Sequence, residues 1–183
     1  MTRSYFFWLT ALFISNLSCE LPDHLMNGNR YIDNNLVKNP SFEINENPSI
    51  VNWIVDSLYT DFVEDTPVNG GRNSLLLFPG MPPSQPRAET YITGLTGVGL
   101  YELKVSMKSL QDRPKGIVTL KIISNKQIKY EKQIKSNSTD WKVYSIVDTL
   151  FIQKNDTVSI YLTTELSPLP IGVLFDLIEF ERL

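Results

Sequence analysis

The segment Tyr101-Glu102-Leu103-Lys104-Val105-Ser106-Met107-Lys108 alternates apolar and polar side chains without a break. Successive side chains of a β-strand point to opposite faces of a sheet, so this alternation predicts a strand with one buried face. Residues 156–163 alternate in the same way. Residues 116–123, 127–134 and 141–152 are rich in Val, Ile, Thr and Tyr, and we predict that they are strands as well.

Turn-forming residues separate these predicted strands, as in Asp112-Arg113-Pro114-Lys115-Gly116 and Ser136-Asn137-Ser138. The region contains no apolar pattern of helical period longer than two turns. Short strands at regular spacing are typical of antiparallel sandwiches and jelly rolls. The sequence therefore predicts one all-β domain over residues 35–183, folded as an antiparallel β-sandwich of the jelly-roll type.

Several short motifs follow one another along this region. They are Asn35-Leu36-Val37-Lys38-Asn39-Pro40-Ser41-Phe42-Glu43, Val51-Asn52-Trp53, Asn69-Gly70-Gly71-Arg72-Asn73-Ser74-Leu75, Ile92-Thr93-Gly94-Leu95-Thr96-Gly97, Thr139-Asp140-Trp141 and Val173-Leu174-Phe175-Asp176-Leu177-Ile178-Glu179-Phe180. In this order they resemble the motifs of jelly-roll carbohydrate-binding modules, the galactose-binding-like group of families 4, 9 and 22. The resemblance implies that the two ends of the domain pair and that the domain binds a glycan.

The resemblance also implies a structural calcium ion between the chain ends. Glu43 and Asp176 would supply carboxylates, and carbonyl groups near Asn39 and Asn73 would complete the shell. Calcium takes six to eight oxygen ligands, which suits this donor set. The family often has a second Asp after the first one near its end, whereas this chain has Leu177 there. The alternative interpretation is that Glu43 and Asp176 are surface charges or caps.

A glycan site needs an aromatic platform with polar groups around it. Tyr161 shares a predicted strand face with Ser159 and Thr163, and Tyr144 shares one with Lys142. The outward residues of the segment quoted first include Glu102 and Lys104. Provided that the strands share a sheet, the expected ligand-binding residues are Tyr161, Ser159, Thr163, Lys104, Glu102 and Tyr144. The alternative for each of them is an ordinary solvated sheet face.

Composition excludes several classes of function. The formal net charge is -3 and Lys and Arg do not cluster, so we predict no nucleic-acid binding. His24 is the only histidine and lies before the domain, which excludes a serine-histidine triad or a histidine-ligated zinc inside it. A glycosidase with paired carboxylates stays open on sequence grounds, although no acidic pair stands in a catalytic motif. We predict that the protein is not an enzyme.

The N-terminus has the pattern of an export signal. Arg3 precedes an apolar run over residues 5–17, which is too short to span a bilayer of about 20 apolar residues. The run ends at Ser18-Cys19, and Cys19 is the only cysteine in the chain. This pattern resembles a bacterial lipoprotein signal, although Asn16 stands where Leu is usual. An ordinary secretory signal is the alternative.

These features divide the chain into a signal peptide at residues 1–18, a lipidated cysteine with a flexible tether at residues 19–34, and the domain at residues 35–183. We expect an exported protein that is anchored by its lipid to the bacterial envelope, at the outer membrane or cell surface. The expected function is non-catalytic binding of a polysaccharide or oligosaccharide. The alternative is a structural or protein-interaction module that binds other envelope proteins and has kept the jelly roll without its sugar site.

Overall fold

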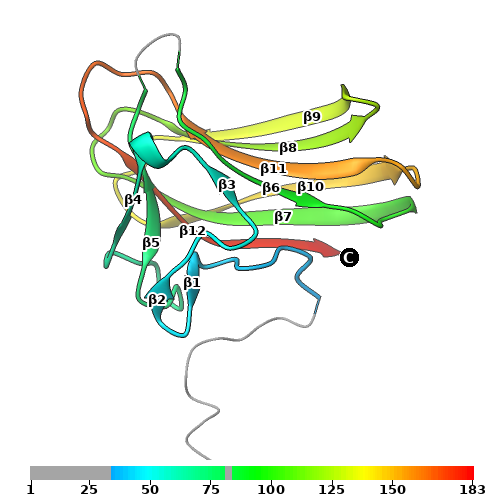
Figure 1. Ribbon diagram of the computed structural model, residues 1–183, viewed down its shortest axis with the longest axis horizontal. Coiled ribbons are helices and arrows are strands. Elements are labelled where there is room, and N and C mark those ends of the chain that lie inside the picture. Colours follow the sequence, from blue (N-terminus) through cyan, green and yellow to red (C-terminus); the bar gives the residue numbers. More distant parts are fainter. Residues whose placement is uncertain (1–33, 81–83) are drawn as a thin grey trace, which may run out of the picture.

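The structure is a computed structural model that describes residues 34–80 and 84–183. Two five-stranded antiparallel sheets face each other (Figure 1). The β7 sheet has the order β10(Lys142–Ile152), β7(Gly97–Ser109), β12(Val173–Arg182), β5(Ser74–Leu77), β4(Thr60–Val63). The β11 sheet has the order β3(Ile54–Val55), β6(Ala88–Ile92), β11(Thr157–Thr164), β8(Gly116–Ser124), β9(Gln127–Ser136). A small hairpin, β1(Glu43–Ile44) with β2(Asn47–Pro48), precedes both sheets in the chain.

The predicted sandwich is confirmed. Each of the five strands predicted from the sequence corresponds to one of β7 to β11, with ends that differ by a few residues. In the described ranges the helical content is the short 3-10 turn η2(Ser57–Tyr59), and no helix there is long and apolar enough to cross a membrane.

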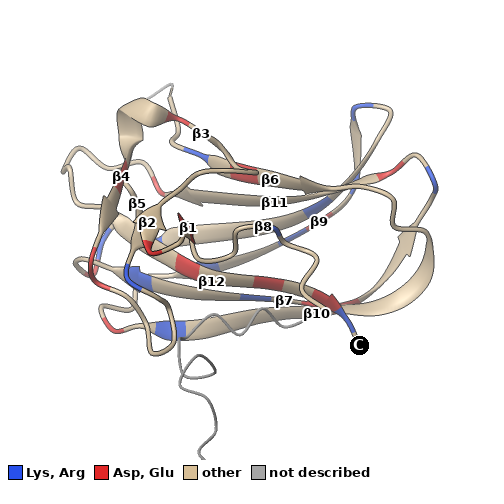
Figure 2. Ribbon diagram, turned by 60° about the horizontal axis from the view of Figure 1, so that its bottom comes forward, with Lys and Arg blue, Asp and Glu red and all other residues tan. Residues whose placement is uncertain are grey.

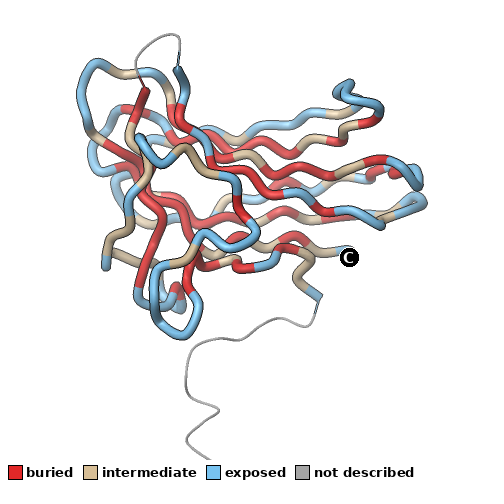
Figure 3. Tube along the Cα trace, viewed as in Figure 1, coloured by how far each residue is buried: buried red, intermediate tan, exposed pale blue. Residues whose placement is uncertain are grey.

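The core lies between the two sheets, where the inward side chains of the strands meet. Figure 3 shows that buried positions recur along the strands of both sheets. On β7 the inward residues are Tyr101, Leu103, Val105 and Met107, all of them buried, as the alternation of this segment predicts. Phe175 and Phe180 of β12 are fully buried, and the Tyr101 ring stacks on Phe180 with centroids 5.3 Å apart. Burial of these large apolar side chains is the main favourable term for the fold.

The two ends of the domain lie side by side, as the resemblance implies. The Leu36 amide donates to the Phe180 carbonyl at 2.8 Å, and the Asn35 side chain bonds both the Ile178 carbonyl and the Phe180 amide at 3.0 Å. The chain therefore begins its folded part next to the strand with which it ends (Figure 1).

The two tryptophans of the domain have different roles. Trp53 is buried, packs on Phe42 with ring centroids 4.8 Å apart and donates its indole N–H to the Asn39 carbonyl at 3.0 Å. Trp141 is only partly buried and donates to Asp65 at 2.8 Å. Trp53 is thus a core residue, whereas Trp141 lies outside the core cluster.

Candidate functional site

Tyr161, Ser159 and Thr163 lie on the outer face of the β11 sheet, which points away from the core. Val158, Ile160 and Leu162 alternate with them on β11 and belong to the core cluster. Because β11 has β6 on one side and β8 on the other, its outward side chains occupy the middle of this face. The structure therefore brings these three predicted residues together, but Ser159 and Thr163 are buried and their hydroxyls already donate to Glu89 and to the Pro86 carbonyl, so Tyr161 is the one of the three that is partly accessible.

A buried acid lies beside Tyr161. Glu89 of β6 and Thr119 of β8 are the cross-strand neighbours of Tyr161. The Glu89 side chain is only 8% exposed, and its carboxylate accepts the Ser159 hydroxyl at 2.6 Å. Arg87 Nη1 is 3.9 Å from the other carboxylate oxygen. Burying a carboxylate is unfavourable unless partners compensate for the lost hydration, and here a hydrogen bond and a nearby cation do so.

Lys121 and Tyr91 flank Ser159 in the same way, one on β8 and the other on β6. The Lys121 ammonium lies over the Tyr161 ring, 4.6 Å from its centroid, at a distance where a cation is attracted to an aromatic face. Tyr91 is 45% exposed. Burial raises the pKa of both the Tyr91 and the Tyr161 hydroxyl, so both are neutral hydrogen-bonding groups at pH 7.

Lys104 and Glu102 do not lie on this face, which corrects the expected grouping. They are on β7, in the opposite sheet, so the core separates them from Tyr161. Figure 2 shows β7 and β11 in different sheets. Lys104 Nζ lies 3.0 Å from both Glu102 and Glu181, and these hydrogen bonds raise the pKa of Lys104. The condition for the six-residue site, that both strands share one sheet, is therefore not met.

Tyr144 also differs from expectation, because it points toward the core side of β10 rather than outward. Its cross-strand neighbour is the buried Val105, and its hydroxyl contacts Ser136 of β9. Val143 and Phe151, by contrast, are exposed on the outer face of the β7 sheet. Alternation gave the wrong direction for Tyr144 because β10 is an edge strand that carries apolar side chains on both faces.

Sequence reasoning missed Glu89, Tyr91 and Lys121. The strand Ala88-Glu89-Thr90-Tyr91-Ile92 is only five residues long, and its two polar residues Glu89 and Thr90 are adjacent, so it shows no clear alternation. Lys121 is a cation within an otherwise apolar strand, which marks an outward position. Their nearness to Tyr161 depends on strand order, which the alternation does not specify.

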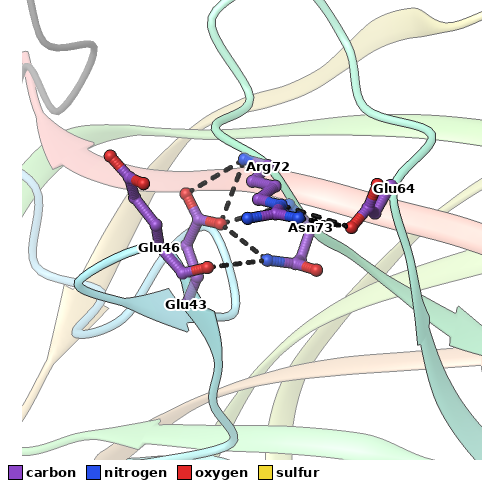
Figure 4. A network of polar contacts seen from close by, with 5 residues as sticks. All are labelled: Glu43, Glu46, Glu64, Arg72 and Asn73. Atoms are coloured by element: carbon purple, nitrogen blue, oxygen red, sulfur yellow. Dashed lines mark hydrogen bonds and ion pairs between the residues drawn. The ribbon is translucent and has the colours of Figure 1, made fainter.

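The second candidate site lies at the hairpin β1–β2. Glu43 is buried, and its carboxylate accepts the backbone amides of Arg72 and Asn73 at 3.1 Å and the Asn73 side-chain amide at 3.2 Å (Figure 4). Arg72 itself turns outward to Glu64, at 2.9 Å. Asn73 therefore donates to Glu43 with its nitrogen and also to the Glu46 carbonyl at 3.3 Å.

Asp176 lies beside Glu43, as the resemblance implies. It is completely buried, its Oδ1 accepts the Leu177 amide at 2.7 Å, and its Oδ2 has no hydrogen-bond partner. Burial, and after it the charge of Glu43, raise the pKa of Asp176 to about 9. A β-bulge follows, with Leu177 at a φ of 48°, and this bulge sets the direction of the Asp176 side chain.

The loop Gly70–Gly71 covers both carboxylates. A Cβ at Gly70 would collide with Asp176 Oδ2, and a Cβ at Gly71 would collide with Glu43 Oε1. Gly71 also has a φ of 73°, which side-chain-bearing residues rarely adopt. The two glycines therefore let the backbone approach the carboxylate pair closely.

These residues fit a calcium ion. An orphaned carboxylate oxygen, a second carboxylate and the surrounding backbone are the hard oxygen donors that this cation takes. Among the described residues no three His, Cys, Asp or Glu side chains form a metal cluster, so carbonyls and water would complete the shell. Asn73 would act by holding Glu43, while the Asn39 carbonyl already accepts the Trp53 indole.

Solved structures share this architecture. One is a carbohydrate-binding module of family 61 in complex with β-1,4-galactotriose, with a TM-score of 0.56 and 16% identity over 81% of this chain and 99% of that one. Another is a family 22 module from Clostridium thermocellum, with a TM-score of 0.51 and 14% identity over 73% of this chain and 88% of that one. The chain has the jelly-roll fold of carbohydrate-binding modules.

The same fold occurs in a tailspike protein of bacteriophage CBA120, in a domain described as enzymatically active. Its TM-score is 0.61 at 15% identity, over 81% of this chain and 21% of that one. No family model and no curated protein matches the sequence. The jelly-roll module fold is therefore established by structure, while the ligand has to be argued from the faces of this chain.

Cys19 and the predicted signal peptide lie outside the described residues, together with residues 20–33 of the predicted tether.

Proposed function

We propose that this protein is a non-catalytic glycan-binding module, tethered through a lipid on Cys19 to the membrane of a bacterial envelope. The observation that supports glycan binding is the outer face of the β11 sheet. There the accessible groups are the aromatic rings of Tyr161 and Tyr91 and the ammonium of Lys121, while Ser159, Thr119 and Glu89 beside them are buried and support the rings from below the surface. An aromatic platform with a few placed polar groups is what a sugar ring requires.

The arrangement of Glu89 supports binding rather than hydrolysis. Glycosidases use two carboxyl groups that flank the scissile bond. Glu89 instead accepts Ser159 and lies beside Arg87, while Glu131 at the rim accepts the Gln133 amide at 3.0 Å. The polar groups of this face thus hold one another in fixed positions, as orienting groups do.

We also propose that Glu43 and Asp176 hold a calcium ion. When bound, the ion would supply positive charge between two buried carboxylates at the junction of the chain ends. Glu43 is kept in position by the Arg72 and Asn73 amides, and Asp176 by its bond to Leu177. The role is structural, because the pair lies apart from the β11 sheet, on strand β12 of the opposite sheet and the hairpin beside it.

Affinity electrophoresis of the full-length chain in neutral detergent tests glycan binding. Gels containing soluble plant, algal, host and bacterial polysaccharides should retard the wild type, and Tyr161→Ala should weaken binding at least tenfold, about 1.4 kcal/mol. Phe151→Ala is the matched control, because Phe151 is an exposed aromatic on the opposite sheet. Unretarded migration in every polysaccharide would contradict the proposal.

The second candidate is a protein-interaction module in the envelope. It is favoured by exposed apolar side chains at one end of the outer face of the β7 sheet. These are Val98, Leu100, Val147, Phe151 and Leu183. Cross-strand pairing brings Val98 next to Phe151, and the Leu183 amide donates to the Leu100 carbonyl at 2.9 Å. Exposed apolar clusters of this kind mark contact surfaces.

A further inference from the structure

The outer face of the β11 sheet carries two lysines that form no ion pair with any residue of the described ranges. Lys121 lies at its centre, partly buried, and Lys135 lies at its rim on β9. None of the ion pairs among the described residues involves either lysine. Glu131 is directly opposite Lys121 in register, yet its carboxylate bonds Gln133 instead.

The opposite sheet shows the contrasting arrangement. On the outer face of the β7 sheet Lys104 lies between Glu102 and Glu181, and Lys108 pairs with Asp65 at 2.6 Å. The half-buried lysines of that face are therefore neutralised by the protein itself. On the β11 sheet, the acid opposite Tyr161 in register is Glu89, and Ser159 and Arg87 already partner it.

The position of Lys121 also limits what can stack on Tyr161. Its ammonium lies over the ring, at the place where the apolar face of a sugar would lie. A neutral sugar would have to displace the ammonium from the ring and would offer the lysine only hydroxyl groups in return. A sugar that carries a carboxylate would replace the cation–π contact with a charge-assisted hydrogen bond, which is the stronger of the two in a partly buried site.

We infer that the glycan bound by this face is acidic, with carboxylate groups that pair with Lys121 and, further along the chain of sugars, with Arg87 or Lys135. Arg87 directly precedes Ala88, the partner of Leu162, at one edge of the site, and Lys135 pairs with Ile117 at the other, so the three cations lie around the tyrosine platform. A uronic-acid polymer, with a carboxylate on successive rings, matches this distribution. The inference rests on the proposed function and specifies its ligand class.

The test compares each acidic polymer with its own uncharged derivative. Isothermal titration calorimetry of the full-length chain in neutral detergent would use oligosaccharides of polygalacturonate, alginate and hyaluronan, each beside its carboxyl-reduced form. We expect at least tenfold tighter binding of one acidic form than of its reduced partner. Raising the salt concentration should narrow that ratio, since ionic contacts near the surface are screened.

Lys121→Met should bring the ratio of the two affinities close to one, while Lys142→Met, an exposed lysine on the opposite sheet, should leave it unchanged. Lys121→Gln is a second variant, and the circular dichroism spectrum and melting temperature show that each variant is folded. A ratio near one for the wild type, or one that Lys121 variants do not alter, overturns the inference and leaves glycan binding intact. Binding of neutral glycans alone overturns it as well, whereas binding of no glycan at all overturns the proposed function with it.

Discussion

At the scale of single residues, Asp176 is the side chain whose charge would be most affected by a bound ion. Its Oδ2 is buried and unpartnered, and the pKa of its carboxyl is raised to about 9 by burial and by Glu43. A buried carboxylate is costly unless something pairs with it. Calcium would bind the ionised form, whereas a proton occupies the same carboxyl in the metal-free protein at neutral pH.

We predict that EDTA lowers the melting temperature of the calcium-loaded wild type. A ligand that binds only the folded state stabilises it by about 2.7 kcal/mol when its free concentration is 100 times Kd. Asp176→Asn should abolish the response to calcium and EDTA, and Asp140→Asn, at an exposed position, is the control. If neither calcium nor EDTA changes the melting temperature of the wild type, Glu43 and Asp176 do not hold a calcium ion.

The metal-free protein should also have a characteristic pH dependence. The folded state binds the Asp176 proton more tightly than the unfolded state, whose pKa is near 3.8, so stability falls as pH rises from about 4 to about 9. The slope from this group is at most about 1.4 kcal/mol per pH unit. Urea unfolding in EDTA should show this slope in the wild type and a flatter profile in Asp176→Asn. Equal slopes in the two proteins would exclude this role for Asp176.

At the scale of elements, the turn between β10 and β11 depends on Asp156. Its carboxylate accepts the Gln153 amide at 2.9 Å and Lys129 Nζ at 3.0 Å, and the Gln153 bond is the main reason that the pKa of Asp156 is lowered. A lowered pKa gives stability that is present above the unfolded value and is lost as pH falls through the folded value. Asp156→Asn should therefore be less stable than wild type at pH 7.

Chemical unfolding at pH 7 and near pH 2 measures this effect. The gap between wild type and Asp156→Asn should shrink in acid, because the wild-type carboxyl is then protonated as well. Lys129→Met should reproduce part of the loss at pH 7, since it removes one of the partners of the Asp156 carboxylate. A gap that does not change with pH would mean that packing rather than charge holds this turn.

Elements are also the scale at which the sequence was most informative. Strict alternation predicted β7 and β11 together with the direction of their side chains, because each of these strands has one face against the core. The same reasoning reversed Tyr144, because β10 is at the edge of its sheet and its outward Val143 and Phe151 are apolar. Alternation indicates which face of a strand is buried only where the core-facing residues are apolar and the solvent-facing residues are polar.

At the scale of the whole molecule, the order of strands decides which residues meet. The alternation and spacing of the strands predicted the sandwich, and the resemblance over the full domain predicted that Glu43 meets Asp176. The grouping of Lys104 with Tyr161 failed, since β7 and β11 lie in different sheets. Long-range pairing of this kind leaves no local signal, which is why Glu89 and Lys121 were found only in the structure.

Anchoring also belongs to the whole molecule. Cys19→Ala should release the protein from the membrane fraction or block its processing. All the proposed acyl chains are attached at Cys19, and stable membrane attachment needs two or more chains. Fractionation with immunoblotting measures the release, and mass spectrometry of the N-terminal peptide identifies the lipid. A wild-type N-terminus that carries no lipid would contradict the proposed anchor, whatever the domain binds.

The neighbouring ends of the domain have a consequence for engineering. Because Leu36 bonds Phe180 and Leu183 is three residues further on, a short linker should join the termini without disturbing either sheet. New termini could then be made in the circularised chain between Asn125 and Lys126. These two residues form the exposed turn that connects β8 to β9, and their φ values are 49° and 66°. By the same geometry, the whole domain could be inserted through its adjacent ends into a surface loop of a host enzyme.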